Sequence, residues 1–350
     1  MIINNVKLVL ENEVVSGSLE VQDGEIRAFA ESQSRLPEAM DGEGGWLLPG
    51  LIELHTDNLD KFFTPRPKVD WPAHSAMSSH DALMVASGIT TVLDAVAIGD
   101  VRDGGDRLEN LEKMINAIEE TQKRGVNRAE HRLHLRCELP HHTTLPLFEK
   151  LVQREPVTLV SLMDHSPGQR QFANREKYRE YYQGKYSLTD AQIQQYEEEQ
   201  LALASHAHVT ESHQLGSVIA EFPTTFEAAE ASRKHGMNVL MGAPNIVRGG
   251  SHSGNVAASE LAQLGLLDIL SSDYYPASLL DAAFRVADDQ SNRFTLPQAV
   301  KLVTKNPAQA LNLQDRGVIG EGKRADLVLA HRKGNHIHID HVWRQGKRVF

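Results

Sequence analysis

Metal-binding side chains recur in this sequence where short apolar runs end. The first such run ends in His55-Thr56-Asp57. Because side chains alternate along a strand, His55 and Asp57 would point to the same side and could bind one metal ion together. Other runs end in further candidates, which are Glu138, His165, His206 and Asp273. A single histidine at a strand end is more often a hydrogen-bonded polar residue than a ligand, so the argument depends on the whole set.

Three histidines and three carboxylates form a mixed nitrogen and oxygen donor set. Such sets suit Zn, Mn, Fe or Co, and no thiolate is offered. A bridging carboxylate lets two metals lie roughly 3.5–4 Å apart, where they lower the pKa of a shared water to about 7. Asp273 would then orient the hydroxide and accept its proton. We therefore expect two divalent metal ions, zinc first and Mn or Fe as alternatives, and a hydrolytic reaction.

A second group of residues is cationic and suits an anionic substrate. Arg66 lies in Thr64-Pro-Arg-Pro67, and Arg248 opens the run Arg248-Gly-Gly-Ser-His-Ser-Gly254. Glycines leave backbone N–H groups open to an anion, and arginine adds a fork of donors. The expected substrate-binding residues are Arg66, Arg170, Arg248, Ser251 and His252. The alternative for the glycine-rich run is a flexible surface loop.

The pattern of apolar runs predicts the elements that position these residues. Strand-like runs alternate with helical patterns, as in a (β/α)8 barrel whose active site lies at the carboxyl ends of its strands. The runs are 51–57, 89–96, 131–139, 157–165, 202–206, 217–222, 237–242 and 268–273. Both chain ends are rich in short strand signals, including a tight turn at Asp23-Gly24. We expect residues 1–49 and 317–350 to form one small β-domain and residues 50–316 to form the barrel.

The segment 166–200 interrupts the barrel pattern. It is polar and rich in Gln, Tyr, Glu and Arg. Two interpretations remain open, a solvated helical insertion and a lid over the mouth of the barrel.

Composition argues against several classes of partner. The formal net charge of -11 argues against general binding to nucleic acid or to an anionic membrane. A local cluster of arginine, histidine and metal still permits a phosphate-bearing substrate. The single cysteine, Cys137, suits a reducing cytoplasm. We expect neither a signal peptide nor a transmembrane helix.

Two segments resemble the amidohydrolase superfamily. They are Pro49–Asp57 and Gly317–Leu329, the latter being the return of the chain to the N-terminal β-domain. The first strand in that superfamily usually carries His-x-His, whereas Asp57 takes the second position here. Longer motifs are similar to the branch that acts in phosphonate utilisation; they are His55–Leu59, Thr64–Pro67, Asp70–Pro72, Asp164–Phe172, Ala220–Thr225 and Gly242–Asn255.

This resemblance implies the substrate. It implies hydrolysis of α-D-ribose 1-methylphosphonate 5-triphosphate to the 5-phosphate and pyrophosphate, with a functional link to the proteins of the carbon–phosphorus lyase pathway. A homodimer is among the expected assemblies. One departure affects the fifth strand, where the family usually shows Ser-His-Asp-Asp and this chain has Ser205-His-Ala-His208. His206 is kept, and Glu221 competes with His165 and His206 for a place in the ligand set.

Other functions remain open. One is an amidohydrolase that cleaves an amide or deaminates a small cyclic substrate, which would need no polyphosphate site. Another is a barrel without metals that acts only in assembly, which would predict broken ligands. Many amidohydrolases bridge their metals with a carboxylated lysine. Glu138, which alternates with Leu133 and Leu135 and so faces inward, is expected to replace it.

Overall fold

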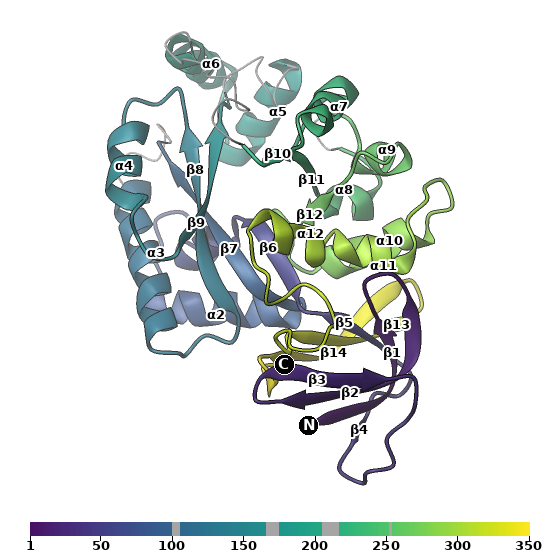
Figure 1. The fold of residues 1–350 in the computed structure, drawn as a ribbon. Coiled ribbons are helices and arrows are strands. Elements are labelled where there is room, and N and C mark those ends of the chain that lie inside the picture. Colours follow the sequence, from purple (N-terminus) through teal and green to yellow (C-terminus); the bar gives the residue numbers. More distant parts are fainter. Residues whose placement is uncertain (100–105, 166–174, 205–216, 252–253) are drawn as a thin grey trace.

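The fold is known from a computed structural model that describes residues 1–99, 106–165, 175–204, 217–251 and 254–350. Figure 1 shows two regions, an antiparallel sheet that holds both chain ends and a larger region of parallel strands and helices. Three predicted site residues lie outside the described residues. They are the metal ligand His206 and the substrate-binding residues Arg170 and His252. No helix in the described ranges is both long and apolar enough to cross a membrane.

The two chain ends share one sheet. Its strand order is β15-β14-β13-β5-β1-β2-β3, and β4 pairs with β1. The predicted turn joins β2 to β3, with positive φ at Asp23 (53°) and Gly24 (84°), as a two-residue hairpin of this kind requires. Leu8, Leu47 and Trp343 pack in its core. The strands are β1 (Ile2–Val9), β2 (Val14–Gln22), β3 (Glu25–Ala30), β4 (Met40–Asp41), β5 (Trp46–Pro49), β13 (Leu327–Lys333), β14 (His336–Arg344) and β15 (Lys347–Arg348).

Seven parallel strands position the candidate site. They form one sheet in the order β6-β7-β8-β9 and another in the order β10-β11-β12. An isolated parallel bridge between Thr56 and Asp273 joins β6 to the end of β12. The strands are β6 (Leu51–Thr56), β7 (Ile89–Ile98), β8 (Glu130–Glu138), β9 (Val157–Met163), β10 (Ile219–Glu221), β11 (Asn238–Gly242) and β12 (Ile269–Ser271). Seven of the eight predicted strands are therefore present.

The prediction of a fifth strand at 202–206 was wrong for its described part. Helix α6 (Asp190–Ala204) continues through residues 202–204. Leucine and alanine are strong helix formers, and a short apolar run cannot by itself distinguish a strand from the last turn of a helix. The described residues show an α/β fold of seven parallel strands, and an eighth strand is not among them.

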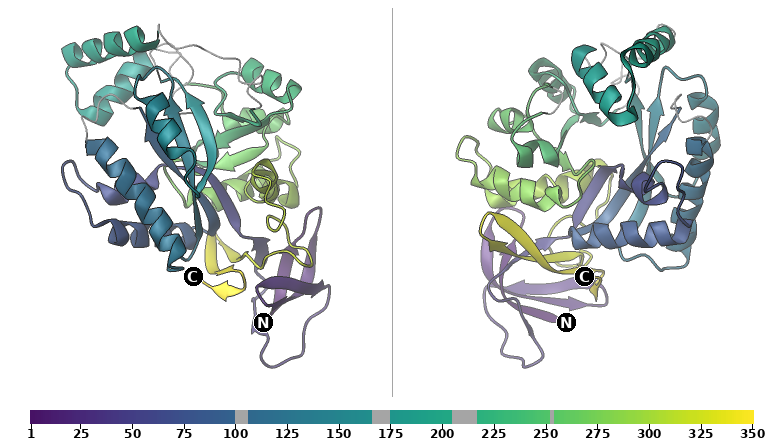
Figure 2. Two further views of the ribbon diagram at one scale, coloured as in Figure 1. Left: turned by 60° about the vertical axis from the view of Figure 1, so that its left-hand side comes forward. Right: turned by 180° about the vertical axis from the view of Figure 1, so that it is seen from behind.

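Helices cover the outer face of the parallel strands, as the two views of Figure 2 show. Leu133 and Leu135 of β8 face outward and pack with Met114 and Ile118 of α3. Ile52, Leu93 and Leu240 instead belong to the cluster that fills the interior. The remaining helices are α1 (Asn58–Phe63), α2 (Ala73–Ala86), α3 (Asp106–Lys123), α4 (Thr144–Leu151), α7 (Phe226–Lys234), α8 (Ala243–Arg248), α9 (Ala258–Gln263), α10 (Ser278–Asp288), α11 (Leu296–Lys301) and α12 (Lys305–Ala310).

The polar insertion forms a helical pair with its own small core. Helices α5 (Arg175–Tyr186) and α6 pack through the rings of Tyr178, Tyr182 and Tyr196. In Figure 1 the pair lies at the end of the molecule opposite the sheet that holds the chain termini. Tyr182 also lines the largest cavity described below, so one side chain of the insertion reaches the candidate site.

A buried ionic network lies beneath α2, on the outer side of β7 and β8. Asp94 of β7 accepts from His80 Nε2 at 2.5 Å and from His131 Nδ1 at 2.7 Å. His131 Nε2 donates to Asp81 at 3.0 Å. Burial alone would lower the pKa of His131, but the two carboxylates raise it to about 9. The histidines and Asp94 could also group around a metal ion. Their separations are those of hydrogen bonds, so an ion-pair network explains them without a metal.

Candidate active site

A cavity of about 650 Å³ opens at the carboxyl ends of the parallel strands. Side chains from β6, β8 and β12 or from the residues just after them line it. Of the six predicted metal ligands, the five that are described all lie on its wall; they are His55, Asp57, Glu138, His165 and Asp273. The fold therefore brings together five residues that were predicted as ligands although they are far apart along the chain.

His55 is at the centre of this set. Its side chain is 2% exposed, its Nδ1 contacts Glu221, and its Nε2 lies 3.6 Å from Asp57 Oδ1. One ligand atom from each of His55, Asp57 and Asp273 lies within 4.8 Å of the others. Burial would lower the pKa of His55, but the Glu221 and Asp57 carboxylates raise it to about 10. A metal-bound imidazole is neutral, so cation binding at His55 would release this proton.

The backbone holds Asp273 next to His55. The Asp273 N–H donates to the His55 carbonyl at 3.1 Å, and the Asp57 N–H donates to the Asp273 carbonyl at 3.3 Å. Asp273 has φ of 53°, an uncommon conformation for a residue other than glycine. Glu53, which is fully buried, joins the same strands by accepting from the N–H groups of His55 (2.8 Å) and Ser272 (2.6 Å). These contacts fix Asp273 at the cavity wall.

Glu221 and His134 extend the cluster around His55. Ligand atoms of His55, His134 and Glu221 also lie within 4.8 Å of one another. Burial would raise the pKa of Glu221, but His55 and His134 lower it to about 2. His134 Nδ1 donates to the Leu54 carbonyl and its Nε2 accepts from Ser161 Oγ, both at 2.9 Å. With both ring nitrogens engaged, His134 is suited to orient its neighbours, a role that the sequence analysis had not assigned to it.

Arg136 is a further cavity residue to which the sequence gave no role. Its Nη1 donates to Asp57 Oδ1 at 2.6 Å. Burial would lower its pKa, but four carboxylates raise it; they are Asp57, Glu221, Glu138 and Asp273. So many acidic groups around one cavity suit divalent cations, and their oxygens combined with imidazole match the donors that zinc accepts. The donor set thus fits a metal-dependent hydrolase.

Glu138 and His165 form a separate pair on the same wall. Glu138 Oε1 contacts His165 Nδ1. Burial would raise the pKa of Glu138, but His165 and Arg136 lower it. Neither residue belongs to a three-residue ligand cluster within the described part of the chain. The predicted ligands therefore fall into two groups, one around His55 and one at Glu138.

The predicted anion-binding residues are divided. Arg248, the last residue of α8, and Ser251 line the cavity. Gly249 follows Arg248 with φ of 82°, which glycine adopts without steric cost. Arg66 is exposed and is not among the residues that line the cavity. The proline-flanked loop had placed it near strand β6 in sequence, but helix α1 separates the two.

Comparisons with known proteins show the family of this chain. A model of the amidohydrolase family matches residues 173–350, about half of the chain. The α-D-ribose 1-methylphosphonate 5-triphosphate diphosphatase of Escherichia coli (strain K12) is 91% identical over 378 aligned positions that cover 100% of both chains. This chain belongs to the amidohydrolase family. Because the alignment has 378 positions and the chain has 350 residues, 28 positions have no counterpart in this chain.

Several solved structures share the fold at low identity. The 5-methylcytosine deaminase of Klebsiella pneumoniae is 15% identical with a TM-score of 0.59, over 100% of this chain and 98% of that chain. An adenosine deaminase of Xanthomonas campestris with bound zinc is 15% identical with a TM-score of 0.56, over 99% and 92%. A D-hydantoinase is 14% identical with a TM-score of 0.58, over 99% and 94%.

Proposed function

We propose that this enzyme hydrolyses α-D-ribose 1-methylphosphonate 5-triphosphate to the 5-phosphate and pyrophosphate. The observation that carries the proposal is one cavity that combines predicted metal ligands with the phosphate-type donors Arg248 and Ser251. Identity of 91% to a diphosphatase of that name supports the same substrate.

The proposed metal ligands are His55, Asp57, Glu138, His165, His206 and Asp273, and they would hold two divalent cations, zinc first and Mn or Fe otherwise. Bound cations would supply a hydroxide nucleophile at neutral pH. Asp273 accepts the proton of the attacking water, since its carboxylate lies beside His55 and Asp57 and its backbone is held by them. The zinc in the Xanthomonas campestris deaminase supports the choice of metal.

Arg248 and Ser251 bind and orient the triphosphate, with Arg170 and His252 as further proposed contacts. Guanidinium groups match phosphate oxygens in a bidentate manner. Arg136, which is buried among carboxylates, holds Asp57 in place. The positive charge of Arg248 and of the bound cations would allow an anionic substrate to bind a protein of net charge -11.

The wider setting is also proposed. The parallel region would be a (β/α)8 barrel over residues 50–316, with the β-domain made of residues 1–49 and 317–350. We place the enzyme in the cytoplasm, where its single cysteine, Cys137, suits the reducing environment. It would act in phosphonate catabolism with the carbon–phosphorus lyase pathway, and a homodimer is one assembly that is open to it.

Pyrophosphate release from the ribose 5-triphosphate tests the function. We expect metal-dependent release by the wild type, and none by His55→Ala, with loss of bound metal but an unchanged circular dichroism spectrum. His74→Ala is the matched control, because His74 is 52% exposed and lies outside the cavity. Turnover of an amide or cyclic amine panel, with no pyrophosphate from the triphosphate, would instead favour the amidohydrolase alternative.

A further inference from the structure

Lys61 is a cation at the wall of the large cavity to which the proposed function gives no role. Within the described part of the chain, three lysine or arginine side chains line this cavity, and they are Lys61, Arg136 and Arg248. Arg136 donates to Asp57 at 2.6 Å, so its charge is already balanced. In the described ranges, neither Lys61 nor Arg248 forms an ion pair with a carboxylate. These two cations are therefore available to an anionic ligand.

Two hydrogen bonds hold the ammonium of Lys61 at the cavity wall. Its Nζ donates to Asn58 Oδ1 at 3.3 Å and to the Tyr274 carbonyl at 3.2 Å. The Asn58 side chain is itself fixed, because it is buried and its Nδ2 donates to Thr56 Oγ1 at 2.7 Å. An ammonium has three N–H donors, so one remains for a ligand. Lys61 thus offers a positioned charge beside the segment that carries Asp273, the residue before Tyr274.

The elements that carry Lys61 and Arg248 flank the residue proposed to accept the proton. Strand β12 pairs with β11 and is joined to β6 by the Thr56–Asp273 bridge. Arg248 belongs to α8, which follows β11, and Lys61 belongs to α1, which follows β6. The end of β12, with Asp273, therefore lies between the two elements that supply the cations.

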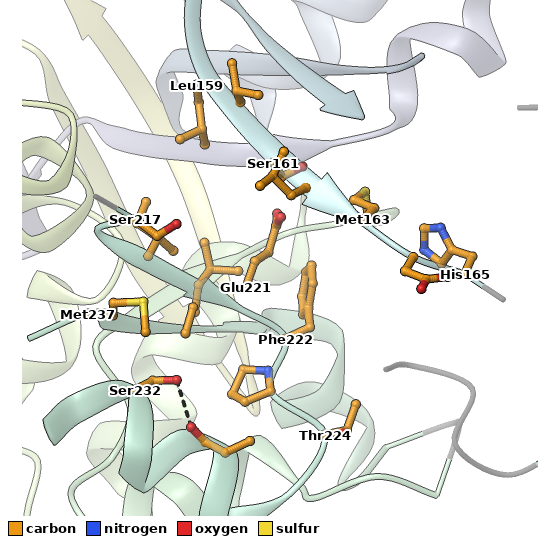
Figure 3. Close-up of a pocket in the computed structure, with 18 residues that line it drawn as sticks. Leu159, Ser161, Met163, His165, Ser217, Glu221, Phe222, Thr224, Ser232 and Met237 are labelled. Carbon is orange, nitrogen blue, oxygen red and sulfur yellow. Dashed lines mark hydrogen bonds between the residues drawn. The ribbon is translucent and has the colours of Figure 1, made fainter. Parts of the chain in front are cut away.

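The side of the cavity near β9 and β10 offers no such cation among the described residues. Met163 and His165, at and just after the end of β9, lie there together with Phe222, which follows β10 (Figure 3). His165 contacts Glu138 and is a proposed metal ligand. An anionic group that neither the metals nor Arg248 binds therefore has Lys61 as its partner in the described cavity.

The proposed substrate has two anionic ends. Cleavage to the 5-phosphate and pyrophosphate leaves the ribose, with its group at C1, on the opposite side of the broken bond from the pyrophosphate. Arg248 suits the polyphosphate, because a guanidinium can bind two phosphate oxygens at once. A methylphosphonate ester at C1 carries one negative charge, which the compact ammonium of a lysine matches.

We propose that Lys61 binds the phosphonate group at C1 and makes the enzyme select substrates that are charged there. This inference rests on the proposed function, since it assigns one end of the same substrate. It also divides the two free cations between the two ends of that substrate, with Arg248 at the triphosphate and Lys61 at the phosphonate.

Two substrates that differ only at C1 test this role. One is α-D-ribose 1-methylphosphonate 5-triphosphate, and the other is the α-methyl riboside 5-triphosphate, which is neutral at C1. Lys61→Met removes the charge and keeps the length of the side chain. We expect its kcat/KM to fall about tenfold for the phosphonate and to stay unchanged for the neutral riboside, because only the phosphonate loses a hydrogen bond to a charged group. Lys61→Arg should retain most of the preference, and added salt should reduce the preference of the wild type.

Lys113→Met is the matched control. Lys113 Nζ lies 3.5 Å from Asn110 Oδ1, three residues earlier on its helix as Asn58 is for Lys61, but Lys113 does not line the cavity. This variant should turn over both substrates like the wild type. Equal losses for both substrates in Lys61→Met would place Lys61 at the triphosphate, and no loss for either would remove it from the binding site. Each of these two results would overturn the proposal.

A binding measurement separates this inference from the proposed function. Ribose 1-methylphosphonate without phosphates at C5 should bind more weakly to Lys61→Met than to the wild type by calorimetry, and Arg248→Ala should bind it like the wild type. If the wild type releases no pyrophosphate but binding still depends on Lys61, the proposed function is refuted and the role of Lys61 stands. Binding that is independent of Lys61 would refute that role even in an enzyme that releases pyrophosphate.

Discussion

Replacing Asp94 with asparagine should destabilise the protein by about 3 kcal/mol. Asp94 is fully buried and accepts hydrogen bonds from His80 (2.5 Å) and His131 (2.7 Å). Asparagine keeps one acceptor oxygen but removes the charge that balances the His131 imidazolium. Removing one partner of a buried ion pair costs about 3–5 kcal/mol. His131 retains Asp81 at 3.0 Å, which places the expected cost at the lower end.

The destabilisation should depend on pH. The folded-state pKa of His131 is raised from 6.5 to about 9 by Asp94 and Asp81 against the effect of burial. Its stabilisation is therefore fully present below pH 6.5 and is lost as the pH rises through 9. At 1.36 kcal/mol per pKa unit, this difference corresponds to about 3 kcal/mol. The gap between wild type and Asp94→Asn should narrow from pH 6.5 to pH 9.5.

Urea unfolding followed by circular dichroism at the two pH values measures the effect, with the m-value checked for constancy. Glu120→Gln is the matched control, because Glu120 pairs with His74 at 3.1 Å while both side chains are about half exposed. That exposed pair should contribute less than about 1 kcal/mol. Equal effects of the two substitutions, or a gap that widens at pH 9.5, would refute the account of the buried network.

Three further outcomes are expected at the cavity. Arg248→Ala should weaken triphosphate binding by about 1.5–3 kcal/mol, the range for hydrogen bonds to charged groups, measured as a rise in KM, whereas Arg66→Ala should leave KM unchanged. Glu138→Gln should lose most of one bound metal by elemental analysis, whereas the control Lys61→Ala should retain both. If Glu138 bridges the metals in place of a carboxylated lysine, wild-type apo-protein should recover activity with metal alone in CO2-depleted buffer. A requirement for bicarbonate would contradict the role of Glu138. Chelation should lower the melting temperature and re-addition of zinc restore it, by linkage of metal binding to folding; an unchanged melting temperature would argue against resident metals.

Local periodicity predicted most of the parallel strands. Runs such as Leu51–Thr56 and Ile89–Ile98 are rich in apolar residues and almost wholly buried, as is usual for central parallel strands. Strands β10 and β12 have only three residues each, and the predicted runs 217–222 and 268–273 extend beyond both of their ends. The run at 202–206 failed because alanine and leucine also favour a helix, and α6 already continues through residues 202–204.

Alternation and position at a strand end predicted which side chains line the cavity, but not how they contact one another. His55 and Asp57 face the same cavity because they lie two residues apart at the end of β6. The contact of His55 with Glu221 spans 166 positions, and only the packing of β10 against the interior creates it. Arg136 could be placed inward by alternation, but its pairing with Asp57 depends on how β8 lies relative to β6.

The way in which the two chain ends share a sheet has a consequence for synthesis on the ribosome. Strand β5 lies between β1 and β13 in that sheet, yet β5 ends at Pro49 and β13 begins at Leu327. At 5–20 residues per second, roughly 15–60 s separate the emergence of the two strands. During this time the edge of β5 that later pairs with β13 has no partner. The nascent chain therefore carries an exposed strand edge, open to pairing with other chains, until its last residues arrive.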